Sequence, residues 1–225
     1  EQNISKRLNG TPLRNGASMA FHESQSRFFE NIIARSKPFT KYTYKTIQKY
    51  ADGVLDKVSW EDYYKAINKV SPSLIRTEAD ELTYCLHIII RYEIERDLIN
   101  GVITVEDAKN MWNKKYEEYL GITPDNDSTG ILQDVHWSDG SFGYFPSYAL
   151  GNAYAAQIFD KMQKEINVLN EISKGNVNAV KDWLTNNVFK YASMLDPNEW
   201  IIKVTGEKLN TKYYIDYLNK KFREL

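Results

Sequence analysis

Most of the sequence has apolar residues at spacings of three, four and seven, the pattern of amphipathic α-helices. The segment 74–100 shows this pattern most clearly, because its apolar side chains share one face: Ile75, Ala79, Leu82, Leu86, Ile90 and Leu98. Similar patterns predict further helices over 17–35, 41–55, 146–175 and 176–195, with shorter ones near Glu199 and over 211–222. The fold is therefore predicted to be all-α, or mainly helical.

Two helix starts carry a capping signal. Ser59-Trp60-Glu61-Asp62 and Thr104-Val105-Glu106-Asp107 place a hydroxyl three residues before an acid, ahead of an apolar run. Gly101 and Gly121 follow apolar segments at positions where helices commonly end. These signals fix the predicted ends of three helices.

One segment, 123–145, lacks the helical period. It contains Pro124 and three glycines, and residues 131–137 could form a strand followed by a turn at 138–141. A long irregular stretch inside a helical domain is uncommon and is usually functional. The sequence thus predicts one helical domain, residues 1–225, with a very small β element around residues 131–145.

Composition excludes several function classes. The formal net charge is −1, so charge gives no reason to expect nucleic acid or an anionic membrane as a partner. No run approaches the roughly 18 apolar residues of a membrane span. The single cysteine, Cys85, cannot form an internal disulfide and indicates a reducing compartment, so we expect a cytoplasmic protein. The first residues contain neither methionine nor a signal peptide, which suggests a piece of a longer chain.

Glu23 is the first candidate site residue. It shares a predicted helix face with Arg27 and Glu30, opposite the apolar stripe. One interpretation is a solvated face with an i,i+4 ion pair. The other is a metal ligand, although a helical zinc site usually needs two histidines four residues apart, and the three histidines here are not so spaced.

Arg76 is the second candidate. It lies with Asp80 in a polar stripe beside the apolar face of its predicted helix. A structural interpretation pairs Arg76 with Asp80, because a buried charge needs a partner. A functional interpretation has the guanidinium of Arg76 bind a substrate carboxylate.

The irregular segment supplies the remaining candidates, Gln133, Asp134, His136, Tyr144 and Tyr148. Polar side chains on such a loop are costly to order unless they bind something. Asp134 and His136 are two residues apart, so a strand would point both to one side, where a carboxylate could orient an imidazole. A histidine placed there could exchange a proton with a reacting group near neutral pH.

Three segments together resemble the Taq-type thermostable carboxypeptidases, a family of helical zinc metallopeptidases. That family carries H-E-S-Q/G, then I-R-x-x-A-D, then G-x-x-Q-D-x-H-W. Here they stand in the same order, as His22 to Gln25, Ile75 to Asp80 and Gly130 to Trp137. The resemblance covers essentially the whole chain. It implies one helical lobe of a two-lobed, saddle-shaped, zincin-like fold, a peptide substrate bound at its C-terminus, and a homodimer.

The resemblance also implies roles at matching positions. Glu23 is similar to the family's third zinc ligand, and Arg76 to a residue that holds the C-terminal carboxylate of the peptide. His136 and Tyr144 are similar to groups that stabilise the oxyanion, with Asp134 supporting them. Gln133 and Tyr148 are implied as further substrate contacts.

The family's H-E-x-x-H segment is expected just before Glu1, so two zinc ligands and the general-base glutamate are expected to be missing. A zinc peptidase needs three protein ligands and an open position for water. The chain is therefore expected to be the C-terminal portion of a metallocarboxypeptidase. Alone, without the H-E-x-x-H segment, it is expected to be inactive. Cobalt or manganese could replace zinc, because carboxylate and imidazole ligands accept all three.

An alternative function belongs to a different class. The chain could be a non-catalytic peptide-binding module that retains the cleft without metal. An H-E-x-x-H ending a few residues upstream of Glu1 would favour the enzyme, whereas a start codon there would favour the module.

Overall fold

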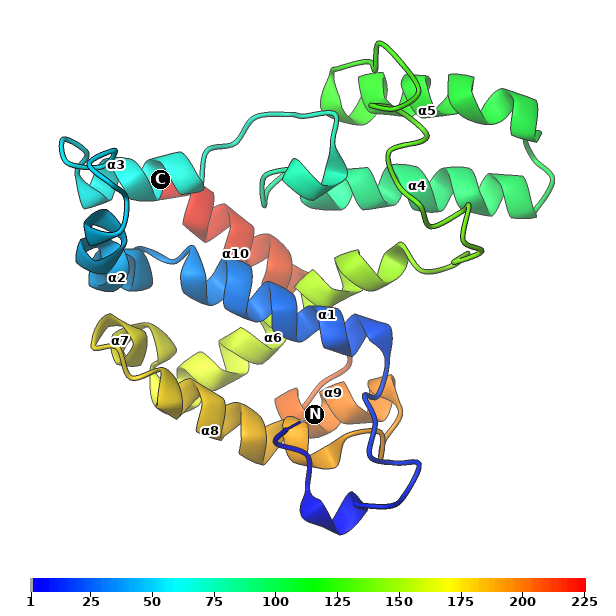
Figure 1. Cartoon of the computed structure of the whole chain (residues 1–225). Coiled ribbons are helices and arrows are strands. Elements are labelled where there is room, and N and C mark those ends of the chain that lie inside the picture. Colours follow the sequence, from blue (N-terminus) through cyan, green and yellow to red (C-terminus); the bar gives the residue numbers. More distant parts are fainter. Residues whose placement is uncertain (1) are drawn as a thin grey trace. The chain divides into compact units, whose positions relative to one another are not determined.

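The computed structural model describes residues 2–225, and within that range all regular secondary structure is helical (Figure 1). The prediction of an all-α fold is confirmed. The α-helices are α1 (Met19–Arg27), α2 (Lys37–Lys49), α3 (Trp60–Ile67), α4 (Tyr84–Ile99), α5 (Val105–Leu120), α6 (Pro146–Ile166), α7 (Val168–Ser173), α8 (Val177–Asn187), α9 (Pro197–Thr205) and α10 (Lys212–Arg223). Short 3-10 helices are η1 (Lys6–Leu8), η3 (Arg76–Glu78) and η4 (Phe189–Tyr191), and η2 (Phe28–Ala34) is a π-helix.

Backbone contacts divide the chain into two compact units. The first unit comprises residues 1–68 and 150–225, and the second comprises residues 69–149. Compact units within one chain need not be separate domains, so the single domain stays a prediction. None of the helices in the described part of the chain is long and apolar enough to cross a membrane.

The core of the first unit forms around α1. The Phe21 ring stacks on Tyr154 of α6 at 4.4 Å between ring centroids and meets the edge of Trp200 of α9 at 4.2 Å. Phe28 is fully buried and lies edge-on to Phe159 of α6. Each buried aromatic ring stabilises the fold by removing apolar area from water, so these side chains join α1 and η2 to α6 and α9.

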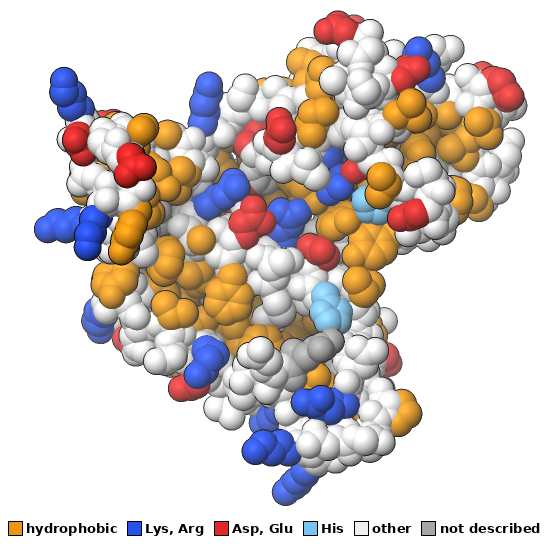
Figure 2. All heavy atoms as spheres, in the orientation of Figure 1, with side chains coloured by type: hydrophobic (Ala, Val, Ile, Leu, Met, Phe, Trp, Pro, Cys, Tyr) orange, Lys and Arg blue, Asp and Glu red, His pale blue; other side chains and the backbone are white. Residues whose placement is uncertain are grey.

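The helix predicted over 17–35 is present, but its second half is wound as a π-helix. Ser18 caps α1 by accepting from the Phe21 N–H. Ser36 caps α2 in the same way, and Pro38 fits the first turn, so α2 begins four residues before its predicted start. The outer face of α2 carries exposed lysines at every fourth residue: Lys37, Lys41, Lys45 and Lys49. Figure 2 shows blue side chains projecting on this side of the molecule.

In the second unit, α4 and α5 lie side by side (Figure 1). Ile90 and Ile94 of α4 pack with Trp112 and Tyr116 of α5, and all four side chains are buried. The predicted cap and stop of α5 are confirmed. Thr104 forms a capping box with Asp107, and Gly121 ends the helix with a φ of +69°.

The prediction of a helix over 74–100 is wrong in its first third, because α4 begins only at Tyr84. The carboxylate of Asp80 accepts hydrogen bonds from the N–H groups of Leu82 and Thr83, and from Ser71 further back. Such local bonds from a short carboxylate compete with the helical pattern. Residues before Thr83 therefore form the short helix η3 and turns.

The small β element predicted around residues 131–145 is also wrong. Among residues 2–225 there is no strand, and this segment is a chain of turns. The cause is long-range, because Gln133, Asp134 and Trp137 are all bonded to groups on other elements rather than to a paired strand.

The helix predicted over 146–175 is likewise divided. Asn167, with a φ of +47°, separates α6 from α7. Positive φ values are uncommon outside glycine, and asparagine tolerates them better than most residues. The region predicted helical over 176–195 holds α8 and η4.

Gly151 of α6 sets how closely α6 approaches the turn of α1 that carries Glu23. A Cβ atom built on Gly151 would lie 2.6 Å from the Glu23 Cβ and 3.0 Å from the Glu23 carbonyl carbon. These are backbone-attached atoms that cannot move aside cheaply. The absence of a side chain at Gly151 therefore fixes the position of Glu23 against α6.

We predict that Gly151→Ala destabilises the protein by about 1–3 kcal/mol through overpacking. In an open helix the same change would stabilise by about 1 kcal/mol, so the sign is diagnostic. Urea unfolding measures the free energy. Lys164→Ala, on an exposed part of α6, serves as control and should change stability by about 0.5 kcal/mol or less. A more stable Gly151→Ala protein would contradict the packing described.

Candidate functional site

Asp134 is the centre of the candidate site in the second unit. Its Oδ1 accepts from Nε of Arg76 at 3.0 Å and from Nη2 of Arg76 at 2.7 Å, and its Oδ2 accepts from Nε of Arg91 at 2.6 Å. Only 9% of the Asp134 side chain is exposed. Burial alone would raise the pKa of Asp134, but the bonds and charges of Arg76 and Arg91 hold it below its usual value.

Arg76 is buried with its guanidinium fork occupied. Besides Asp134, it bonds through Nη1 to the hydroxyl of Tyr84 at 3.1 Å, and its charge lies 4.8 Å from the ring centre of Tyr148. The alternative pairing with Asp80 is not the one that forms, because Asp80 accepts from backbone N–H groups instead. A role for Arg76 at a substrate carboxylate stays a prediction, and it would require part of this fork to be released.

Arg91 and His87 lie beneath Asp134 on α4, and neither side chain is exposed. Arg91 Nη1 donates to the His87 carbonyl at 2.8 Å and to the hydroxyl of Tyr116 at 3.2 Å. His87 Nδ1 lies 3.1 Å from the same hydroxyl. Burial, followed by the charges of Arg91 and Arg76, lowers the pKa of His87 to about 3, so the ring is neutral at pH 7.

Gln133 fastens the start of the site loop to η3. Its Oε1 accepts from the Arg76 backbone N–H at 2.8 Å, and its Nε2 donates to the carbonyls of Leu74, Thr129 and Gly130 at 3.0–3.1 Å. With both ends of its amide bonded to backbone, Gln133 has a structural role in this arrangement. Its predicted contact with substrate is untested.

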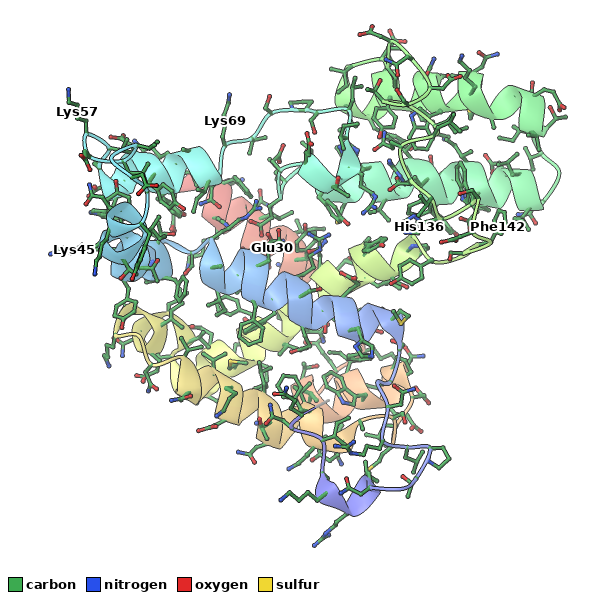
Figure 3. All side chains as sticks on the ribbon, viewed as in Figure 1. Glu30, Lys45, Lys57, Lys69, His136 and Phe142 are labelled. Atoms are coloured by element: carbon green, nitrogen blue, oxygen red, sulfur yellow. The ribbon has the colours of Figure 1, made fainter. Side chains whose placement is uncertain are left out.

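His136, Tyr144 and Tyr148 form an aromatic cluster on the loop and the first turn of α6. His136 Nε2 lies 3.0 Å from the Tyr148 hydroxyl, and the imidazole packs 4.3 Å from the ring of Phe145. The Tyr144 ring centre lies 5.6 Å from that of His136. Figure 3 shows His136 and Phe142 at two points along this loop. The cluster provides a histidine and two phenols close together, which are groups that can donate hydrogen bonds to a reacting oxygen.

The predicted contact between Asp134 and His136 is not formed as a hydrogen bond. The nearest atoms, Asp134 Oδ1 and His136 Nδ1, are 4.0 Å apart. The prediction assumed a strand, whereas the turns of this loop direct Asp134 to the arginines and His136 to Tyr148. Burial lowers the pKa of His136, and of the neighbouring charges Asp134 opposes this effect while Arg76 adds to it.

Glu23 belongs to the first unit, whereas the other candidates belong to the second. Its side chain is 22% exposed, its Oε2 accepts from the Ser26 hydroxyl at 3.1 Å, and Arg27 Nε lies at 4.0 Å. The predicted i,i+4 pairing of Glu23 with Arg27 is therefore present as a loose contact. The carboxylate remains partly accessible.

A metal centre cannot be completed by the described residues alone. Within residues 2–225 no group of three or more histidine, cysteine, aspartate or glutamate side chains lies together. Glu23 supplies one carboxylate, which suits a single position in a zinc site that needs three protein ligands.

Sequence reasoning missed Arg91, Glu95 and Tyr116. Arg91 and Glu95 stand in the apolar run from Ile88 to Ile94 or directly after it, and their side chains are 0% and 7% exposed. Charged residues within an apolar helical run need buried partners. That signal was available in the sequence, although it could not name the partners.

The chain is similar to known metallopeptidases over nearly its whole length. Residues 1–222 match the model of the family described as carboxypeptidase Taq (M32) metallopeptidase. Carboxypeptidase 1 of Bacillus subtilis is 50% identical over the whole chain, and thermostable carboxypeptidase 1 of Thermus thermophilus is 40% identical. The chain spans 45% and 44% of the length of these two relatives.

The fold is shared with solved structures. The crystal structure of the M32 carboxypeptidase from Deinococcus radiodurans superposes with a TM-score of 0.96 at 37% identity. The superposition covers 99% of this chain and 45% of that protein. A carboxypeptidase of Pyrococcus furiosus gives a TM-score of 0.95 over 98% of this chain and 44% of its own length, also at 37% identity.

We predict that His87 makes the free energy of unfolding decrease as the pH is lowered. Its pKa is about 3 when folded and about 6.5 when unfolded, so the unfolded state binds the extra proton between these values. The contribution of the neutral His87 ring to the free energy of unfolding is therefore fully present above about pH 6.5. Below that pH it falls by at most about 1.4 kcal/mol per pH unit.

Urea unfolding at pH 7 and pH 5 tests this contribution. From pH 7 to pH 5, the free energy of unfolding of His87→Gln should fall by about 2 kcal/mol less than that of the unmodified chain. His22→Gln, at an exposed position, is the matched control and should behave as the unmodified chain does. An identical pH dependence for His87→Gln would refute the neutral buried ring.

Proposed function

Because the chain belongs to the carboxypeptidase Taq (M32) metallopeptidase family, we propose that it forms part of a zinc-dependent carboxypeptidase. The enzyme would hydrolyse single residues from the C-termini of peptides. The match of residues 1–222 carries this proposal, and the His136, Tyr144 and Tyr148 cluster supports it. Since the chain spans 45% of its relative's length, the activity is proposed for the longer protein, as are the cytoplasmic location and the homodimer.

Glu23 is proposed as one ligand of the zinc. Its carboxylate is partly accessible and is held in place by Ser26 and by the close approach of Gly151. Two histidines and a glutamate of an H-E-x-x-H segment outside this sequence would complete the site, and cobalt or manganese could replace zinc. The bound metal would polarise the scissile carbonyl and activate water. Without that segment the chain is proposed to be inactive.

The loop cluster is proposed to stabilise the oxyanion. A hydrogen-bond donor fixed before the reaction stabilises developing charge more than a mobile one, because no reorganisation is needed. His136 is fixed by Tyr148 and Phe145, and Tyr144 lies beside it. Asp134 supports this arrangement through Arg76, whose charge faces the Tyr148 ring.

Combining two parts tests the function. The part of Bacillus subtilis carboxypeptidase 1 that this chain does not span would be co-expressed with the chain, and release of C-terminal amino acids would be measured. We expect hydrolysis only when both parts are present. Peptide binding without hydrolysis would instead favour the non-catalytic module.

Glu23→Ala in that assembly should remove the bound metal, as measured by elemental analysis. Loss of one of three ligands leaves too few for a tight site. Glu30→Ala is the matched control, because Glu30 lies in the adjoining η2 helix, is half-exposed and pairs with Arg27 and Arg35. Unchanged zinc stoichiometry in the Glu23 variant would reject the ligand assignment.

Arg76 is tested separately from Arg91, which bonds to the same carboxylate of Asp134. If Arg76 attracts the terminal carboxylate, Arg76→Lys should weaken the binding of a peptide with a free C-terminal carboxylate about tenfold. The binding of the same peptide with a C-terminal amide should not change. Arg91→Lys also disturbs Asp134, but Arg91 is fully buried and cannot reach a peptide. This variant should therefore change the binding of both peptides equally. Calorimetry measures both constants. Equal losses for both peptides in Arg76→Lys would contradict a direct role.

A further inference from the structure

Two buried side chains of opposite charge lie one turn apart on α4. Arg91 is 0% exposed and Glu95 is 7% exposed. Residues four apart on a helix commonly pair with each other. Here each is bonded to the loop that carries His136 and Tyr144, and the two bind different parts of it.

Arg91 holds the part of the loop before His136. Its Nε donates to Asp134 Oδ2 at 2.6 Å, and Asp134 is two residues from His136. Its other bonds, to the His87 carbonyl and the Tyr116 hydroxyl, fix the guanidinium itself. Arg91 is thus a rigid anchor and has no exposed surface with which to meet a substrate.

Glu95 holds the part of the loop after His136. One carboxylate oxygen accepts from the Trp137 indole N–H at 2.7 Å, and the other accepts from the Gly143 backbone N–H. Trp137 directly follows His136, and Gly143 directly precedes Tyr144. Gly143 has a φ of +79°, which a residue with a side chain would adopt only with strain.

These bonds bracket both members of the proposed oxyanion site. Because Arg91 and Glu95 are on one helix, the loop is tied at Asp134, Trp137 and Gly143 to a single rigid element. The anchors therefore determine how far His136 lies from Tyr144 along a loop that has no strand or helix of its own.

We propose that Arg91 and Glu95 are positioning residues that set the geometry of His136 and Tyr144 without touching substrate. The inference rests on the proposed function for its catalytic consequence, while the positioning itself can be tested on the chain alone. Neither Arg91 nor Glu95 belongs to the three sequence motifs that carry the other candidate residues.

Glu93 of the same helix provides the contrast. It is also a partly buried carboxylate, and it accepts from Lys115 at 2.6 Å and from the Tyr119 hydroxyl at 3.1 Å. Both partners belong to α5, so Glu93 joins the two helices and none of its bonds reaches the loop. A purely structural carboxylate on α4 should behave as Glu93 does.

The experiment measures hydrogen exchange by NMR in Glu95→Gln and Glu93→Gln. A glutamine at position 95 keeps one acceptor oxygen and replaces the other with a donor, so the nearly isosteric variant should fold. We expect the Trp137 indole N–H or the Gly143 amide to exchange about tenfold faster, and the His136 ring signal to shift. Glu93→Gln should change none of these three signals.

Unchanged exchange at Trp137 and Gly143, with an unchanged His136 signal, in Glu95→Gln would overturn the proposal. Equal changes in Glu93→Gln would overturn it too, because they would indicate a general loss of stability.

The catalytic consequence is measured in the assembly with the Bacillus subtilis part. Glu95→Gln should lower kcat about tenfold with KM changed less than about twofold, since donor placement matters most in the transition state. An unchanged kcat would remove the catalytic consequence. If the unmodified assembly itself hydrolyses nothing, the proposed function fails, while the exchange data still decide the positioning.

Discussion

The second unit depends on one buried carboxylate shared by two guanidinium groups. Asp134 accepts from Arg76, 58 residues earlier, and from Arg91, 43 residues earlier. Removing one partner of such a buried set costs about 3–5 kcal/mol, because the remaining charge stays uncompensated. On α4 the buried charged side chains are Arg91 and Glu95, and both are bonded to the loop that carries His136.

The same bonds connect the fold to its proposed chemistry. The α4–α5 pair supplies a rigid support, and the loop from Gly130 to Phe145 gains its order from side-chain bonds to that support. A catalytic loop without regular secondary structure needs such bonds, since donors that must reorganise stabilise a transition state poorly. Glu23 has a comparable constraint in the first unit, where Gly151 brings α6 against its backbone.

Local features were predictable from the sequence, whereas long-range ones were not. The caps at Ser59 and Thr104 were predictable because donor and acceptor are three residues apart. The start of α4 was not, because Asp80 redirects the backbone through bonds that periodicity does not show. The partners of Asp134 and His136 were also missed, since both depend on how distant segments pack. The resemblance implies roles for His136 and Tyr144. The sequence also shows Arg91 and Glu95 as charges in an apolar helical run, but their partners follow only from the packing of distant segments.

The ionisation of Asp134 tests this account most directly. Its carboxyl 13C chemical shift would be followed from pH 7 to pH 2, together with the Nε–H signals of Arg76 and Arg91. We expect the carboxylate to stay ionised well below its ordinary value of about 3.9 and both Nε–H groups to exchange slowly while it does. Titration at or above about 3.9, with rapidly exchanging guanidinium signals, would contradict the shared buried ion pair on which the site depends.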